Sequence, residues 1–142
     1  MTMATTAEAP AAPAQKKWPV WVGRVATALP ILLLVFSASM KLMRSPEFLE
    51  QFVGKLGYPA STAVPIGVIE LACAILYAIP RTAVLGAILV TAYLGGAVAT
   101  HLRIGEPVFL AILPGIFVWI GLYLRDARLR ALVPLVSPSA TR

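Results

Sequence analysis

Four long apolar runs constrain the fold of this chain more than any other feature of its sequence. They cover Val20–Met43, Ala63–Ile79, Ala83–Thr100 and Val108–Leu124, and few charged residues interrupt them. A helical segment of roughly 17 to 25 apolar residues is long enough to cross a hydrocarbon core about 30 Å thick. In lipid, a helix also satisfies its own backbone hydrogen bonds. The runs therefore predict an all-α fold, namely a transmembrane four-helix bundle.

The composition agrees with a membrane protein. Hydrophobic residues make up 59% of the 142 residues and charged residues 13%, whereas a soluble domain is typically about 25% charged. The net charge is +6, but the Lys and Arg residues lie between the apolar runs and at the ends rather than in a basic stripe. That placement is typical of membrane flanks and not of nucleic-acid binding, so we expect the lipid bilayer as a partner and no nucleic acid.

The chain divides into a membrane domain and two tails. Residues 1–17 are rich in Ala, Pro and Thr, which predicts a disordered N-terminal tail. Residues 18–134 hold the four-span domain, and residues 135–142 form a C-terminal tail. Phe36–Ser39 ("FSAS") offers small residues after an apolar core, as in a secretory signal. However, the first run is long for a signal and three more follow, which favours an uncleaved first span.

A short amphipathic helix is expected between the first two spans, within Ser45–Pro59. Ser45 can cap it, Pro46 suits its first turn and Gly57 can end it. Its apolar residues Phe48, Phe52 and Leu56 recur every four positions. Two placements fit this pattern equally and are compatible with each other: the helix lies in the membrane interface, and it packs on its own bundle.

Four spans place both termini on one side of the membrane. In this arrangement that side carries Lys16, Lys17, Arg24, Arg81, Arg125, Arg128, Arg130 and Arg142, and the other side carries Lys41, Arg44, Lys55 and Arg103. Positively charged flanks favour the cytoplasmic side, which predicts that both termini are cytoplasmic.

Glu70 lies about halfway along the second run, where an acid is costly unless it is paired, protonated or hydrated. Its neighbours on the same helix face include Gly67, Cys73 and Tyr77, and the bulky aliphatic residues lie on the opposite face. We therefore expect Glu70 to face the bundle. It is either a neutral acid that takes part in proton or ligand binding, or one half of an ion pair.

Three more polar residues join Glu70 as candidates for a ligand-binding or proton site: Lys41, Tyr93 and His101. Lys41 ends the first span, and taken alone it is typical of an interfacial lysine that reaches outward; the alternative is that it turns inward to Glu70. Tyr93 and His101 share a face of the third span with Ala97 and Thr100, a pattern that could line the bundle.

The third span also carries a row of small residues that recur every four positions: Ala83, Ala87, Thr91, Gly95 and Ala99. Such rows let helices approach closely, so we expect helix packing here, within the bundle or in a homo-oligomer. Catalytic and metal-binding motifs are not found, and one Cys with one His cannot assemble a zinc or bis-His haem site. We expect no metal or nucleotide cofactor.

Several segments resemble the DoxX-like family: "KLM" closing the first span, "GYP" before the second, "GVIEL" within it, "IPRTAVLGAILVTAYLGGAVATHLR" and "VWIGLYLRDARLRALVP". The resemblance extends over about Trp18–Pro134. It implies a small four-helix protein of the bacterial inner membrane, with the family's polar positions at Lys41, Glu70 and His101. Relatives often carry a glycine shortly before the lysine, where this chain has Ser37, Ala38 and Ser39.

The functions that the resemblance implies are varied, because the wider superfamily includes subunits of a quinone oxidoreductase and members in thiol-redox control. We therefore weigh three functions. The first is an accessory subunit of a membrane redox system, with a quinone as the candidate cofactor and a redox protein as partner. The others are a scaffold or assembly factor without a ligand, and a small proton-linked transporter. The sequence indicates no autonomous enzyme.

Overall fold

A computed structural model describes residues 18–132, and within them every regular element is a helix. The elements are α1 (Trp18–Met43), α2 (Pro46–Leu49), the π-helical turn η1 (Glu50–Lys55), the 3₁₀ turn η2 (Ala60–Thr62), α3 (Ala63–Ala78), α4 (Ala83–Arg103), α5 (Phe109–Arg125) and α6 (Ala127–Leu132). The all-α prediction is confirmed. The two predicted tails, residues 1–17 and 135–142, lie outside the described residues.

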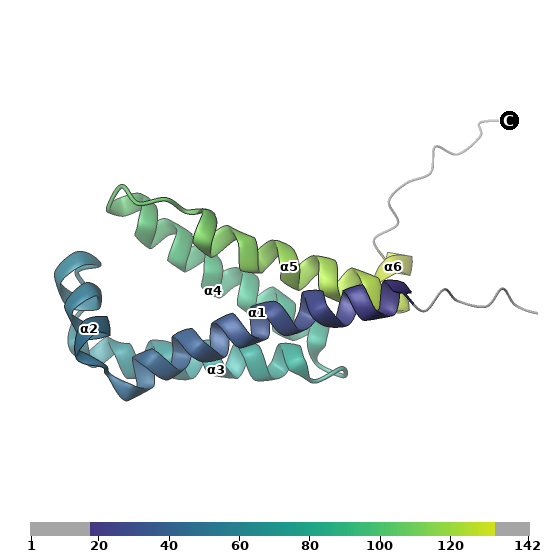
Figure 1. Cartoon of the computed structure of the whole chain (residues 1–142), viewed down its shortest axis with the longest axis horizontal. Helices are drawn as coiled ribbons and strands as arrows, with labels where there is room; N and C mark the ends of the chain where they lie inside the picture. Colours follow the sequence, from purple (N-terminus) through teal and green to yellow (C-terminus); the bar gives the residue numbers. More distant parts are fainter. Residues whose placement is uncertain (1–17, 133–142) are drawn as a thin grey trace, which may run out of the picture.

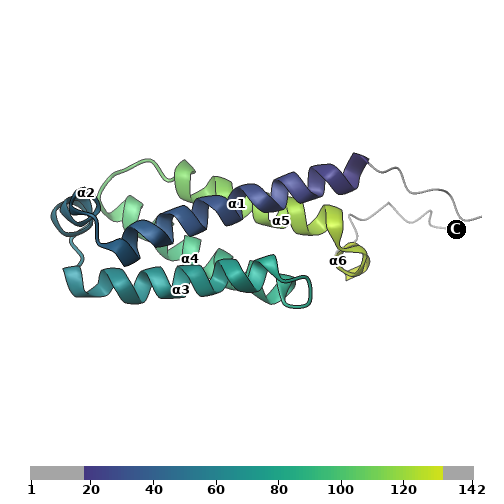
Figure 2. The same ribbon diagram turned by 60° about the horizontal axis from the view of Figure 1, so that its bottom comes forward.

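The four long helices form a bundle in which each helix packs on two others (Figure 1). Helix α1 packs on α3 and α5, and α4 packs on the same two helices, so α1 and α4 lie on a diagonal. The start of α1 and the short α6 lie at one end, which we call the terminal end. Helix α2 and turn η1 lie at the opposite end, which we call the capped end (Figures 1 and 2).

Three of these helical segments are long and apolar enough to cross a membrane: Trp21–Met43, Ala60–Ala78 and Ala83–Arg103. The fourth, α5, is apolar but has 17 residues, about 26 Å at 1.5 Å per residue, which is the lower end of the range for a span. Large apolar side chains are exposed along all four helices, among them Leu32, Val68, Leu85 and Ile116. The chain is a multi-pass membrane protein whose apolar sides face lipid.

The helices approach most closely toward the terminal end. A Cβ atom at Gly86 would lie 2.2 Å from the backbone nitrogen of Tyr77, and one at Gly121 would lie 2.7 Å from Thr27 Oγ1. The Tyr77 hydroxyl, fully buried, donates to the carbonyl of Val118 at 2.8 Å and so joins α3 to α5. Glycine at these crossings lets the backbones meet, which holds the four helices together at this end.

The small-residue row predicted on α4 is only partly a packing face. Ala83 and Ala87 are buried, but Thr91, Gly95 and Ala99 are exposed, and nothing lies within 4 Å of a Cβ atom built at Gly95. The reason is geometric: with 3.6 residues per turn, each step of four residues rotates the row by about 40°. Over four steps the row moves to the opposite side of the helix. Within the bundle, only Ala83 and Ala87 of the row are buried, and packing of the other three residues in a homo-oligomer stays a prediction.

A cap consisting of Arg44–Gly57 closes the outer face of the capped end. The Ser45 hydroxyl accepts from the backbone N–H of Phe48 at 3.3 Å, and Gly57 ends the segment with a φ of 72°, as the sequence predicts. Phe52 on the underside of the cap is 2% exposed. The segment therefore packs on its own bundle through Phe52, and its position in the membrane interface stays a prediction.

Candidate functional site

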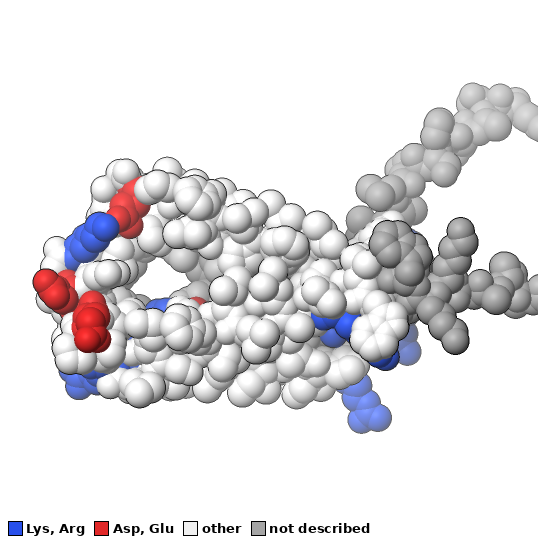
Figure 3. Space-filling view, in the orientation of Figure 1, with Lys and Arg blue, Asp and Glu red and all other residues white. Residues whose placement is uncertain are grey.

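A cavity of about 590 Å³ lies in the capped half of the bundle. Helices α1, α3, α4 and α5 form its walls and the cap contributes its roof. Most lining residues are apolar, among them Leu33, Leu34, Phe48, Phe52, Ile66, Leu94, Leu110 and Pro114; the polar ones are Ser37, Lys41, Tyr58, Glu70, Tyr93, Thr100 and His101. Figure 3 shows a hollow at the capped end, with charged atoms visible at its edge. A volume of this size lies within the range of about 300–1,000 Å³ that is typical of small-molecule sites.

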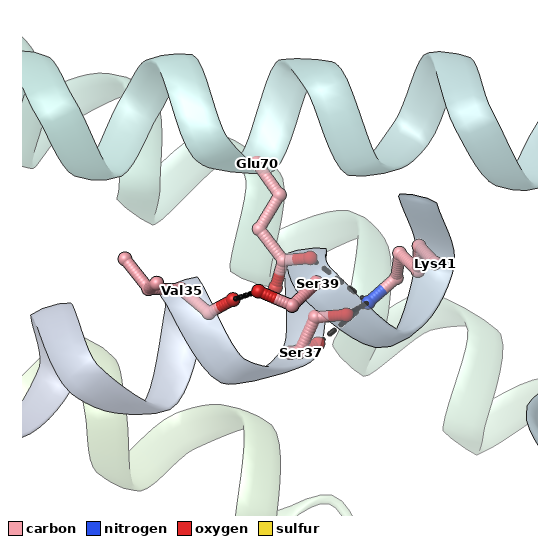
Figure 4. A network of polar contacts seen from close by, with 5 residues as sticks. All are labelled: Val35, Ser37, Ser39, Lys41 and Glu70. Atoms are coloured by element: carbon pink, nitrogen blue, oxygen red, sulfur yellow. Dashed lines mark hydrogen bonds and ion pairs between the residues drawn. The ribbon is translucent and has the colours of Figure 1, made fainter. Parts of the chain in front are cut away.

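An ion pair between Lys41 and Glu70 lies at the wall of the cavity. Glu70 reaches across from α3, and its Oε2 atom is 2.9 Å from Lys41 Nζ on α1 (Figure 4). Lys41 also donates to Ser37 Oγ at 2.5 Å. The two side chains are 11% and 3% exposed, respectively. The prediction that Glu70 faces the bundle is confirmed, and the interfacial interpretation of Lys41 is wrong because its ammonium group turns inward to this acid.

A tight crossing of α1 and α3 positions the pair. A Cβ atom at Gly67 would lie 2.9 Å from Lys41 Cβ, so the glycine one turn before Glu70 lets the lysine pass close to α3. The ammonium group of Lys41 donates to both Glu70 and Ser37, so the polar atoms of this buried pair have partners within the protein. Lys41 Nζ also lies 5.7 Å from the ring centre of Phe48 in the cap, which links the pair to the roof.

Tyr93 and His101 line the same cavity from α4, together with Ala97 and Thr100. The structure therefore brings all four predicted site residues around one space. His101 is half-buried, and its Nδ1 lies 3.1 Å from Glu106 Oε2 in the loop between α4 and α5. His101 thus lines the cavity near the end of α4, and its position in the membrane interface stays a prediction.

Sequence reasoning missed the polar contacts that join the cap, and Tyr58 just after it, to α4 and its following loop. The Tyr58 and Thr100 hydroxyls are 2.8 Å apart, the Arg103 guanidinium donates to the carbonyl of Leu56, and the Lys55 ammonium pairs with the Glu106 carboxylate. The hydrogen bond from Lys55 is the main reason why the pKa of Glu106 is lowered. The "GYP" motif and the charged residues near Gly57 and Gly105 are visible in the sequence. Nothing in the local pattern indicates that the residues of these two segments contact one another beside the cavity.

The arrangement defines a class of site rather than a particular reaction. The apolar walls can pack against the apolar part of a ligand. The hydroxyl, carboxylate, ammonium and imidazole groups of the lining can form hydrogen bonds with a few of its polar atoms. Within residues 18–132, no group of three or more His, Cys, Asp or Glu side chains could hold a metal ion. The molecule is thus an integral membrane protein with a small-molecule-sized cavity inside a helical bundle.

Comparison with known proteins gives the family. The model of the DoxX-like family matches residues 25–123, which include α3, α4, most of α1 and α5, and every residue of the ion pair and cavity described above. The chain belongs to the DoxX-like family. No curated protein and no solved structure matches it.

Proposed function

We propose that this protein is an accessory subunit of a membrane redox system, located in a bacterial inner membrane with both termini in the cytoplasm, and that it binds a quinone in the cavity. The observation that carries the proposal is one apolar cavity lined by Lys41, Glu70, Tyr93 and His101. A quinone needs an apolar space for its ring and a few groups that bond its carbonyl oxygens. The lining supplies hydroxyl, imidazole and ammonium donors beside apolar walls.

The access route of such a ligand supports the same assignment. Leu33 on α1 and Leu110 on α5 both line the cavity and are exposed, and the hollow is visible on the face that carries these two helices (Figures 1 and 3). That face lies among lipid-facing side chains. A molecule dissolved in the bilayer can therefore reach the polar lining without crossing water, which suits a quinone with a long apolar tail.

The proposed redox role requires a partner, because the chain has no flavin or metal motif and a single, buried cysteine, Cys73. Electrons would be exchanged between the bound quinone and a separate redox protein, whether quinone- or thiol-linked. The chain would position the quinone and provide groups that donate to or accept from its oxygens. It would not carry out electron transfer by itself.

Two adjacent glycines provide a matched test. Gly96 lines the cavity and Gly95 faces away from it, and in both cases a Cβ atom would meet nothing within 4 Å. Gly96→Leu should fill the cavity without disturbing the backbone, whereas Gly95→Leu adds the same side chain outside. We expect quinone extracted from purified protein to fall to background in Gly96→Leu and to stay at the wild-type level in Gly95→Leu. Equal quinone content in both variants, or no quinone above detergent blanks in the wild type, would contradict the proposal.

A scaffold or assembly factor is the second candidate, and the Lys41–Glu70 pair favours it, because a buried pair can fix the register of two helices. In that case the cavity is not occupied and binding of a protein partner does not depend on it. Native mass spectrometry of protein released from membranes distinguishes the two. A bound quinone together with a redox partner supports the first function, and a partner that is retained equally by the wild type and Gly96→Leu without quinone supports the second.

A further inference from the structure

The cap has the features of a hinged roof over the cavity. It connects to α1 at Arg44, whose φ of 51° is unusual for a residue with a side chain, and it ends at Gly57 with a φ of 72°. At each end of the cap, one residue has a φ angle in the left-handed region. The sharp change in chain direction is therefore confined to that single residue. Segment hinges are commonly a few residues of this kind that absorb a change in backbone dihedrals.

The underside and the upper surface of the cap differ in character. Phe48, Phe52 and Leu56 line the cavity from above, and the Phe52 ring stacks on that of Tyr58 with centroids 5.2 Å apart. The upper surface carries Glu47, Glu50 and Gln51, which are exposed. The cap therefore separates the cavity and the Lys41–Glu70 pair from the aqueous phase on this side of the membrane.

The free side of the cap is attached to α4 and its following loop by two polar contacts. These are the pair of Lys55 with Glu106 and the hydrogen bond from Arg103 to the backbone carbonyl of Leu56. Neither contact involves an apolar side chain of the underside. Exposed ion pairs and hydrogen bonds of this kind are individually weak, so they can be broken without unfolding the bundle, which the terminal end holds together.

We propose that the cap, Arg44–Gly57, is a latched lid that controls access of water and protons to the cavity from the capped side, with Lys55–Glu106 and Arg103–Leu56 as its latch. When the latch is closed, a ligand enters from the bilayer and the ion pair stays out of water. When it opens about Arg44 and Gly57, the Lys41–Glu70 pair and any bound ligand exchange protons with the outer phase. This regulation rests on the proposed function of the cavity, but its test needs no ligand.

The test measures how fast a charged, membrane-impermeant maleimide reaches a cysteine inside the cavity. The reporter is Gly96→Cys in a Cys73→Ala background, because Gly96 faces the cavity and has room for a side chain. The reagent carries charge and cannot enter through the lipid-facing side, so labelling reports opening of the lid. Lys55→Glu places two carboxylates at the latch, as Glu106→Lys places two ammonium groups there.

We expect each of these two substitutions to speed labelling of the reporter about fivefold, in line with the modest strength of an exposed pair. The double variant Lys55→Glu/Glu106→Lys restores an ion pair, and its labelling rate should return close to that of the parent. Glu50→Lys is the matched control. Glu50 is exposed on the cap and forms none of the ion pairs observed within residues 18–132, so reversing its charge should leave the labelling rate unchanged. A Ser61→Cys reporter on the exposed surface should label fast and equally in every background.

Other outcomes overturn the proposal. If the parent reporter labels as fast as Ser61→Cys, the cap does not exclude water; if both single substitutions leave the rate unchanged, the contact is not a latch. Thermal unfolding of each variant shows whether faster labelling comes from global unfolding, in which case the double substitution would not restore it. A missing quinone in purified protein would contradict the proposed function but would not affect these rates.

Discussion

The Lys41–Glu70 pair provides the sharpest prediction about stability. Two unit charges 2.9 Å apart attract each other by about 6 kcal/mol at an effective dielectric constant of about 20. The cost of desolvating both groups offsets much of this attraction. Removing one partner, however, leaves the other as an uncompensated charge with 11% or less of its side chain exposed, which typically costs about 3–5 kcal/mol.

We therefore expect Lys41→Met and Glu70→Leu each to lower the free energy of unfolding by about 3–5 kcal/mol, and the double substitution to lower it by about 1 kcal/mol or less. The single substitutions should not be equal. Lys41 lies two residues from the end of α1, so after Glu70→Leu its long side chain can reach toward the cap and water. Glu70 lies deep in α3 and is shorter, so Lys41→Met should be the more damaging change.

The assay is unfolding in mixed micelles with increasing sodium dodecyl sulfate, followed by tryptophan fluorescence. Ser39→Ala is the control, because Ser39 is exposed on α1 and bonds only within its helix, to the carbonyl of Val35 at 2.7 Å; it should change stability by less than about 0.5 kcal/mol. If the effects of Lys41→Met and Glu70→Leu add to within about 0.5 kcal/mol in the double variant, the two groups do not interact and the reasoning is refuted.

Three further predictions follow from the geometry. Gly86→Leu should prevent folding, because even a Cβ atom there would lie 2.2 Å from the α3 backbone, whereas Gly95→Leu should change the melting temperature by no more than a few degrees. Infrared difference spectra between the wild type and Glu70→Gln should show a carboxylate band at neutral pH, as the contact with Lys41 requires; a carbonyl band of a protonated acid in the wild type would contradict the ion pair. The Lys55–Glu106 contact lowers the pKa of Glu106 from its usual 4.5, so its stabilising effect should be complete above about pH 4.5 and disappear as the pH falls through the lowered value. Labelling of the Gly96→Cys reporter should accelerate over that interval, and Glu106→Gln should abolish the pH dependence.

Much of the fold could be predicted because it depends on local patterns. The apolar runs define the spans, since their length is set by the membrane, and the aliphatic residues opposite Glu70 indicate which way the acid faces. The capping signals of Ser45 and Gly57 also depend on neighbouring residues alone. Each of these features can be derived without knowing where the other helices lie.

The parts that could not be predicted depend on contacts between segments far apart in sequence. The direction of Lys41 is set by an acid 29 residues away, and a lysine at a helix end has the same local pattern whether it points outward or inward. The extent to which the small-residue row of α4 packs inside the bundle could not be predicted for a different reason. Its spacing of four residues resembles a continuous face, but the rotation of about 40° per step moves Thr91 and the residues after it out of the bundle.

The glycines have two roles in the bundle: Gly86, Gly121 and Gly67 mark close helix crossings, whereas Gly96 leaves space at the cavity. Gly86 and Gly121 bring backbones together near the terminal end, where the Tyr77 and Arg125 side chains add hydrogen bonds to the carbonyls of Val118 and Tyr77. In the capped half, Gly96 has no neighbour within 4 Å of its Cβ position, so the same residue type there creates space instead of contact. The helices can diverge around a cavity because they are joined elsewhere. Substitutions at the terminal end should therefore act on unfolding, and substitutions such as Gly96→Leu should act on ligand content alone.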